Sequence, residues 1–277
     1  MRFDLHVHTT ASDGTLTATQ LVDRACTLGL AALSITDHDS VDSVDAACNA
    51  AADTPLRLIP GVELSTVYDG HDVHILGYFI DPEHQGFRTQ LLQLRSARLA
   101  RAEAMVRALV EAGFEVTLDE VLRLTDGGSV GRSHVARVLV ERGHAADISD
   151  AFHRFVGRDR PFYVPKPVAG PLEVIRSILD AGGVPVLAHP GVTSVDAAIP
   201  ELVDAGLQGL EAYHAEHTPG MRDRYRALAE RMGLIVTGGS DFHGLASPGA
   251  TLGSVDMPDS VLFHLYERAG REWEPAA

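Results

Sequence analysis

Histidine, aspartate and glutamate residues occur at the ends of several short apolar segments of this 277-residue chain. The segment RFDLHVH ends with two histidines, and LSITDHDS has Asp-His-Asp directly after its apolar part. Imidazole and carboxylate groups are the usual ligands of Zn, Mn and Fe ions, and they also act as general acids and bases. The residues in question are His6, His8, Asp37, His38, Asp39, Glu63, His189, Asp241 and His243.

The spacing of these residues favours a metal site over unrelated surface positions. His6 and His8 are two positions apart on a predicted strand, so both side chains project from the same face. Asp241 and His243 have the same offset. A lone histidine is more often a surface or hydrogen-bonded residue than a ligand, but several such groups at strand ends indicate a shared site. The set exceeds the three or four ligands of a mononuclear site, which indicates more than one ion.

Short apolar segments alternate with amphipathic helical segments, which is typical of parallel strands covered by helices. We predict a (β/α)7 barrel, with an open doubly wound sheet as the alternative. No GxGxxG motif supports a dinucleotide-binding form of that alternative. In a parallel barrel the carboxyl ends of the strands meet at one mouth, where active sites are built. The expected strands are 2–8, 30–36, 56–64, 72–79, 183–189, 206–214 and 233–241. The expected barrel helices are 17–28, 44–52, 171–181, 196–205, 220–232 and 258–268.

Residues 83–165 interrupt this alternation. Helical patterns follow one another there without an intervening strand, at 87–113, 117–124, 131–142 and 147–156. We expect a mostly helical insertion, or cap, at 83–165, in a barrel formed by residues 1–82 and 166–277. Residues 88–166 carry a net charge of +3, whereas the whole chain carries −15. The insertion is therefore the part of the chain that is suited to bind an anion.

The composition excludes several classes of protein. Hydrophobic residues make up 45% of the chain, which is too many for disorder. No run of about 18 apolar residues is present to span a membrane. The net charge of −15 argues against duplex DNA as a partner, because duplex binding depends on Lys and Arg side chains that neutralise phosphates. The first ten residues lack the apolar stretch of a signal peptide, and the two cysteines form no CxxC pair. We expect a reduced, cytoplasmic protein.

The motifs HVHTTASDGTLT, LSITDHDS, PGVELS, HILGY, AHP and SDFHG resemble the successive motifs of the PHP (polymerase and histidinol phosphatase) family of metal-dependent phosphoesterases. The resemblance includes GRSHVARVLVERG and PFYVPK in the insertion. It implies an α/β fold, a distorted (β/α)7 barrel, and two to three divalent ions as cofactors, with Mn, Fe or Zn as the candidates. Within the family the chain is most similar to bacterial phosphoesterases that act on nucleoside 3′,5′-bisphosphates. Some relatives of that kind are 5′→3′ exoribonucleases.

The resemblance also implies which side chains hold each ion. The first ion would be held by His6, His8, Glu63 and Asp241. The second would share Glu63 as a bridge and be completed by His74 and His189. The third would be held by Asp13, His38 and His243. Asp13 departs from the family pattern, in which a histidine is frequent at this place, and it adds a negative charge to the third site.

A bisphosphate substrate needs a second anion site away from the ions. The resemblance and the charge of the insertion point to Arg132 and to Lys166, the only lysine of the chain, with His134 as a further candidate. Arginine can bind phosphate bidentately. The alternative for Arg132 is that it only caps or solvates its own helix. His214 and His217 follow the sixth strand and are not assigned as ligands, and we expect His214 to contact the substrate.

We predict a hydrolase that converts a small nucleotide, such as the 3′,5′-bisphosphate pAp, to the 5′-monophosphate and phosphate. The catalytic candidates are Glu63, Asp241 and His243, beside which a metal-activated hydroxide would attack phosphorus in line. One alternative is a 5′→3′ exoribonuclease or oligonucleotide phosphodiesterase that acts on short RNA. Others are histidinol-phosphate phosphatase and a non-catalytic, metal-stabilised binding module. The sequence leaves the metal, the physiological substrate and the oligomeric state open.

Overall fold

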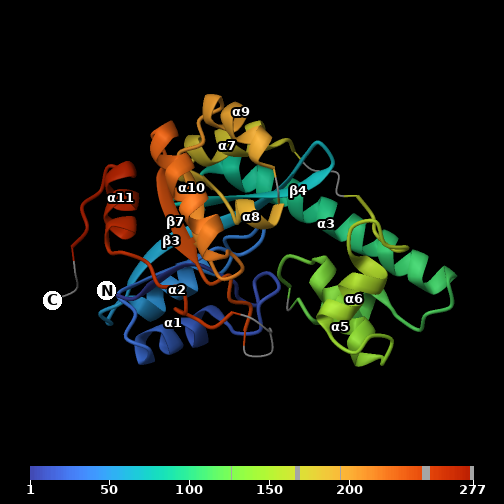
Figure 1. The fold of residues 1–277 in the computed structure, drawn as a ribbon. Coiled ribbons are helices and arrows are strands. Elements are labelled where there is room, and N and C mark those ends of the chain that lie inside the picture. Colours follow the sequence, from blue (N-terminus) through green and yellow to red (C-terminus); the bar gives the residue numbers. More distant parts are fainter. Residues whose placement is uncertain (126, 166–168, 194, 245–249, 275–277) are drawn as a thin grey trace.

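The computed structural model describes residues 1–125, 127–165, 169–193, 195–244 and 250–274. Within these ranges, seven strands form one sheet in which each strand neighbours the next in sequence order (Figure 1). The short strands are buried throughout, as expected for strands that helices cover. The strands are β1 (Phe3–Val7), β2 (Ala32–Ile35), β3 (Arg57–Tyr68), β4 (His71–Tyr78), β5 (Val184–Leu187), β6 (Gly209–His214) and β7 (Ile235–Gly239).

The first and last strands meet and nearly close the sheet into a barrel, so the predicted fold class is confirmed. The His8 N–H donates to the Phe242 carbonyl over 2.9 Å, and the Asp241 N–H donates to the His6 carbonyl over the same distance. The closure therefore lies at the predicted site residues. It places the end of β1 directly beside the end of β7.

One strand departs from the predicted parallel arrangement. β4 is antiparallel to both β3 and β5, while the remaining neighbours are parallel. The reason is that no helix separates β3 from β4. Asp69 and Gly70 join them in a tight turn with positive φ at both residues, which is the geometry of a two-residue hairpin. His74 consequently lies within its strand rather than at the carboxyl end.

The barrel helices begin and end at local sequence signals. α10 illustrates this, because the Thr218 side chain accepts a hydrogen bond from the Met221 N–H, Pro219 occupies the first turn, and Gly233 follows the helix with a φ of +67°. The barrel helices are α1 (Ala18–Thr27), α2 (Val44–Ala51), α7 (Pro171–Asp180), α8 (Pro190–Thr193), α9 (Ile199–Asp204) with the 3₁₀ turn Asp196–Ala198 before it, α10 (Pro219–Met232) and α11 (Ser260–Arg268).

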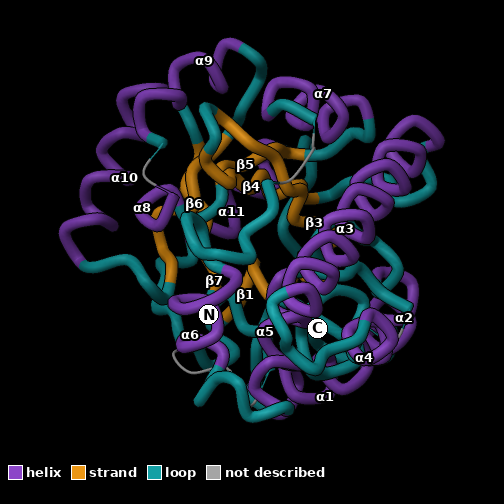
Figure 2. Tube along the Cα trace, turned by 90° about the vertical axis from the view of Figure 1, so that its right-hand side faces the viewer, coloured by secondary structure: helices purple, strands orange, loops and turns teal. Residues whose placement is uncertain are grey.

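The helices between β4 and α7 lie beside the barrel (Figures 1 and 2). The start of α3 packs on the barrel through Phe87 and Leu91. Met105, in a later turn of α3, belongs to a separate apolar core that also contains Leu139 of α5. The predicted helix 147–156 is divided into a short α-helix and a π-helix. These helices are α3 (Gln85–Glu111), α4 (Leu118–Arg123), α5 (Arg132–Glu141), α6 (Ile148–Ala151) and the π-helix Phe152–Val156. The boundaries 83–165 remain a prediction.

None of the helices in the described ranges combines the length and the hydrophobicity that a membrane span requires.

Candidate metal centre

The predicted ligands meet at one mouth of the barrel. β1 provides His6, and His8 follows it. His38 lies just after β2 and forms a parallel bridge with Glu63, which is within β3 and not at its end as the expected strand 56–64 had it. Asp39, His189 and Asp241 have positive φ angles of 50°, 28° and 54°. Such angles are costly for residues other than glycine and concentrate at functional sites. The backbone is therefore strained at the residues that follow the strand ends, beside the ligand cluster.

Glu63 lies at the centre of the cluster. Its side chain is only 1% exposed, and five imidazole rings of the described residues approach its two carboxylate oxygens. His74 and His189 lie 2.8 and 3.0 Å from Oε1. The atoms nearest to Oε2 are His38 Nδ1 at 2.9 Å, His6 Nε2 at 3.3 Å and His8 Nε2 at 3.3 Å. A carboxylate in this position can bridge ions that the surrounding rings bind.

Asp241 shares two of these rings. Its Oδ1 lies 3.4 Å from His6 Nε2 and 3.1 Å from His8 Nε2. Its Oδ2 lies 3.5 Å from Nε2 of His214, a buried residue at the end of β6. The carboxylates of Asp241 and Glu63 therefore face the same pair of imidazole nitrogens, which is the arrangement predicted for the first ion.

Asp13 forms the third part of the cluster. Its Oδ1 is 3.2 Å from His243 Nε2 and 4.0 Å from His8 Nδ1. The rings of His8 and His243 stack with centroids 4.1 Å apart. The other oxygen, Oδ2, accepts a 2.6 Å hydrogen bond from Ser133 of α5. One oxygen of Asp13 thus faces the histidines while the other is fixed by the insertion.

The donor set fits divalent metal ions. Four groups of donor atoms, each within 4.8 Å of one another, together contain all nine predicted ligands. The groups are His6–His8–Glu63, His6–His189–Asp241, His38–Glu63–His74 and His8–Asp13–His38–His243. Buried atoms that point inward, including His6 Nε2, His8 Nε2 and Glu63 Oε2, have no hydrogen-bond partner. Buried polar atoms are rarely left unpaired, so a bound cation would account for them. Which ligand serves which ion remains a prediction.

Protonation of the metal-free cluster is uneven. Burial alone would lower the pKa of His243, but Asp13 and Asp241 raise it to about 10. Burial would likewise lower the pKa of His6, and the carboxylates of Glu211, Asp241 and Glu63 raise it well above its usual value. In contrast, burial dominates at His38 and lowers its pKa to about 3. Protons therefore occupy some of the positions that cations would take.

The carboxylates of the cluster are correspondingly ionised. Burial opposes ionisation of Glu63, but His38, His74 and His6 lower its pKa well below the usual value. At Asp241 burial is outweighed by His6 and His243, which lower the pKa well below normal. Anionic carboxylates beside imidazole nitrogens are the protonation state that cation binding requires.

The aspartates on either side of His38 support the site instead of binding there. Asp37 accepts hydrogen bonds from Thr9, Ser12 and Ser43 at 2.5–2.7 Å and so fixes the loop after β1. Asp39 accepts from the Ser65 N–H at 2.6 Å and pairs with Arg98 of α3.

Arg98 extends this support to the insertion. Its guanidinium also donates to Ser65 Oγ at 2.7 Å and to the Val130 carbonyl at 3.3 Å. The side chain is 7% exposed, so it forms a buried link between barrel and insertion. Arg98 is not among the predicted site residues, because nothing in the sequence of its helix distinguishes it from the neighbouring arginines.

The predicted substrate residues lie in different places. Arg132 pairs with Asp72 at 2.8 Å, and its guanidinium lies over the rings of Phe152 and Tyr163. His134 is buried, and its Nδ1 accepts a hydrogen bond from the N–H of Gly131. Lys166 lies outside the described residues.

His214, the last residue of β6, and His217, which follows the strand, have different surroundings. His214 faces the cluster through Asp241. His217 is buried, with Nδ1 donating to the Ala212 carbonyl at 2.9 Å and Nε2 accepting from the Gly191 N–H at 3.1 Å. Both ring nitrogens of His217 are therefore used within the fold, and His217 has a structural role.

A cleft of about 1000 Å³ lies between the metal centre and the insertion. Asp13, Asp241 and His243 belong to one side, and Arg137 and Phe152 belong to the other. Arg132 and His134 are not among the lining residues. The remaining lining residues are Thr15, Ser133, Val140, Glu141, Ala146, Asp147, Ile148, His214, Ala215, Glu216, Ser240 and Ala250. A substrate in this cleft would touch the metal centre and the insertion together.

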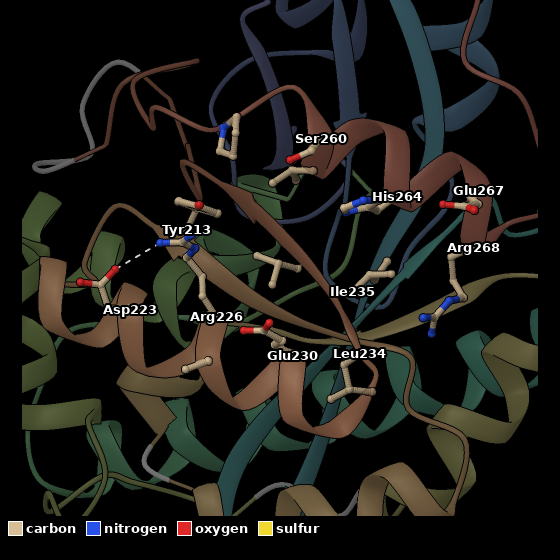
Figure 3. Close-up of a pocket in the computed structure, with 14 residues that line it drawn as sticks. Tyr213, Asp223, Arg226, Glu230, Leu234, Ile235, Ser260, His264, Glu267 and Arg268 are labelled. Carbon is tan, nitrogen blue, oxygen red and sulfur yellow. Dashed lines mark hydrogen bonds and ion pairs between the residues drawn. The ribbon is translucent and has the colours of Figure 1, made fainter.

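A second hollow, of about 800 Å³, lies between α10 and α11 (Figure 3). Both of its arginines are engaged with neighbours. Arg226 pairs with Asp223 at 3.2 Å, and Arg268 donates to the carbonyls of Gln208 and Gly233. None of the predicted ligands is among its lining residues. Asp13, Asp241 and His243 line the cleft, so the predicted metal centre opens into the cleft and not into this hollow.

Comparisons with known proteins agree with this site. Residues 4–160 match the family model of the PHP domain. A 5′-3′ exoribonuclease Rnm of Salmonella typhimurium is 38% identical, over 87% of this chain and 85% of that protein. A 3′,5′-nucleoside bisphosphate phosphatase of Chromobacterium violaceum is 35% identical, over 92% of each.

A solved structure shows the same fold. The protein, from Bifidobacterium adolescentis, is assigned to the metal-dependent phosphoesterases and is 35% identical to this chain. It superposes with a TM-score of 0.89 and covers 96% of both chains. Family model, relatives and ligand cluster agree, so the chain belongs to the PHP family and is a metal-dependent phosphoesterase.

Proposed function

We propose that the protein hydrolyses a 3′,5′-bisphosphate nucleotide such as pAp to the 5′-monophosphate and phosphate. The observation that carries this proposal is the cleft, which has the metal centre on one side and Arg137 of the insertion on the other. A nucleotide with two phosphates has one anionic group for each side. The name of the Chromobacterium violaceum relative supports the same substrate. The non-catalytic alternative is not retained, because the relatives are enzymes.

Two or three ions of Mn, Fe or Zn would be held by the nine predicted ligands. Such ions neutralise phosphate oxygens and lower the pKa of bound water toward neutrality. The protein contributes the geometry. Glu63 and Asp241 hold the His6 and His8 rings with their Nε2 atoms facing inward, and His243 stands where the cluster meets the cleft. We assign catalytic roles to Glu63, Asp241 and His243.

His214 is proposed as a direct contact to the reacting phosphate. Its Nδ1 accepts a 3.2 Å hydrogen bond from the Glu216 N–H, so the neutral ring carries its proton on Nε2. That atom lies 3.5 Å from Asp241 Oδ2, and His214 lines the cleft. A fixed N–H beside the metal centre can donate to a phosphate oxygen whose charge increases during the reaction.

Arg137 is proposed as the ligand of the second phosphate. It projects from α5, which faces the metal centre through Ser133, and it lines the cleft. Arg132 and Lys166 remain candidates for the same role. To bind the phosphate, Arg132 would have to break its ion pair with Asp72. The apolar side chains of Val140, Ile148 and Phe152, which line the same side, would contact the nucleoside.

A second candidate is 5′-3′ exoribonuclease activity on short RNA. The observation in its favour is the similarity to the Salmonella typhimurium exoribonuclease, 38% identical over 87% of this chain. Both reactions break a phosphoester bond next to another phosphate, so one metal centre serves either. The difference between them lies in how much of the nucleic acid enters the cleft.

A comparison of substrates distinguishes the two activities. Metal-loaded protein is assayed with pAp and with 5′-phosphorylated RNA of two to five nucleotides, and histidinol phosphate is included as a third compound. The proposal predicts that kcat/KM is highest for pAp. A higher kcat/KM for the oligonucleotides would favour the exoribonuclease, and a higher value for histidinol phosphate would exclude both.

A further inference from the structure

A bulge in β6 turns a buried carboxylate toward the metal centre. Glu211 pairs with Thr237 of β7, while Tyr213 and His214 pair with the next two residues, so the register shifts between Glu211 and Tyr213. Side chains alternate along a regular strand, and residues three apart would point to opposite faces. Because of the extra residue, Glu211 and His214 both reach the same side, where each has a donor atom within 4.8 Å of His6.

Each oxygen of Glu211 contacts a different predicted ligand. Oε1 lies 2.9 Å from His6 Nδ1, and Oε2 accepts a 2.8 Å hydrogen bond from the His189 N–H. The Glu211 side chain is fully buried, so water does not compete for these bonds. Glu211 is absent from the predicted ligand set, although an acidic residue within the apolar strand GLEAYH is an available signal.

We infer that Glu211 is a positioning residue that sets the tautomer of His6 and the backbone of His189. A carboxylate beside Nδ1 holds the ring proton on that nitrogen. The lone pair of Nε2 is then the one available to an ion that displaces the second ring proton, and Nε2 lies 3.3 and 3.4 Å from the carboxylates of Glu63 and Asp241. An imidazole that donates to a carboxylate is also a more basic and better oriented ligand.

The hydrogen bond from the His189 N–H to Glu211 Oε2 holds the backbone of His189 in place. His189 has a positive φ of 28°, a strained value for a histidine. Its N–H is fixed by Glu211 Oε2, and its Nε2 reaches Glu63 at 3.0 Å. One buried carboxylate therefore supports two ligands that come from different strands. This inference depends on the metal centre and is independent of which phosphoester is the substrate.

Replacement of Glu211 by glutamine tests the role without changing the size of the side chain. The amide oxygen can still accept from the His189 N–H, but a neutral amide no longer matches the His6 Nδ1–H. Titration with Mn²⁺ is expected to show about 10- to 100-fold weaker binding of the affected ion. The number of ions bound at saturation is expected to be unchanged. Glu230→Gln, which removes a charge from the exposed face of α10 (Figure 3), is the matched control and should bind as the wild type does.

Two outcomes would overturn the inference. Unchanged Mn²⁺ affinity in Glu211→Gln would show that Glu211 does not act on the ligands. Loss of one ion at saturation would make Glu211 a ligand itself. If Glu211→Gln does not fold, the wild-type protein still provides a test, because ¹⁵N NMR of the Zn²⁺-loaded form must show the His6 proton on Nδ1. A proton on Nε2 would contradict the proposal, whatever substrate the enzyme prefers.

Discussion

The hydroxyl of Ser133 donates a 2.6 Å hydrogen bond to Asp13 Oδ2 and so joins the insertion to the predicted third ion site. The two residues are 120 positions apart in the chain. Asp13 also lies 3.2 Å from His243, whose positive charge outweighs burial and lowers the pKa of the Asp13 carboxyl well below its usual value. The helix that covers the cleft is thus in direct contact with the metal centre.

The first prediction concerns this contact. Ser133→Ala removes the hydroxyl and leaves Asp13 free to rotate away from His243. A hydrogen bond to a charged group contributes about 1.5–3 kcal/mol, so the ion that Asp13 would hold should bind about tenfold less tightly. Elemental analysis after dialysis against a metal buffer measures this. Ser149→Ala, at an exposed position on α6, should retain the wild-type metal content. Equal retention in both variants would show that the contact does not support the third site.

The second prediction concerns the buried link made by Arg98. Arg98→Ala leaves the Asp39 carboxylate buried without this partner and should reduce the free energy of unfolding by about 3–5 kcal/mol. Arg95→Ala is the matched control, because Arg95 lies on the same helix and pairs with Asp42 at the surface. Its cost should stay below about 1 kcal/mol. Urea denaturation of both variants measures the difference, and equal costs would contradict the role assigned to Arg98.

The third prediction concerns protons released when metal binds. In the metal-free protein His243 has a pKa of about 10 and the pKa of His6 is also raised, so both rings are protonated at pH 7. An ion displaces these protons, and its affinity should therefore rise with pH by about tenfold per unit for each proton displaced. Calorimetry at pH 7 in two buffers of different ionisation enthalpy measures the release. Identical heats in both buffers would contradict this assignment.

The fourth prediction concerns the second phosphate. Arg137→Ala should raise KM for pAp by about tenfold or more, because a charge-assisted contact is lost, with little change in kcat. Hydrolysis of p-nitrophenyl phosphate, which has a single phosphate, should be unaffected. Arg132→Ala is measured alongside. An effect confined to Arg132→Ala would assign the second phosphate to Arg132 instead.

Much of the site could be predicted because strand geometry determines it. His6 on β1 and His8 just after it lie two residues apart, and both rings face Glu63. The alternation of strands and helices predicted the barrel, and the carboxyl ends of β1 and β7 indeed meet at the metal centre. These features follow from local periodicity, which the sequence displays directly.

Other features depend on contacts that local patterns do not display. β4 is antiparallel because the two-residue turn Asp69–Gly70 joins it to β3, whereas the alternation of strands and helices predicted parallel strands. Glu211 reaches His6 only through a bulge, which a regular alternation does not predict. Ser133 meets Asp13 because the insertion folds back over the barrel, and no short-range signal indicates that contact.

The central claim is that nine side chains from distant parts of the chain form one multinuclear metal centre. Anomalous diffraction from crystals grown with Mn²⁺, recorded at the manganese edge, tests it most directly. We expect two or three peaks within bonding distance of Glu63, Asp241 and Asp13. A single peak, or peaks elsewhere on the molecule with none beside Glu63, would contradict it.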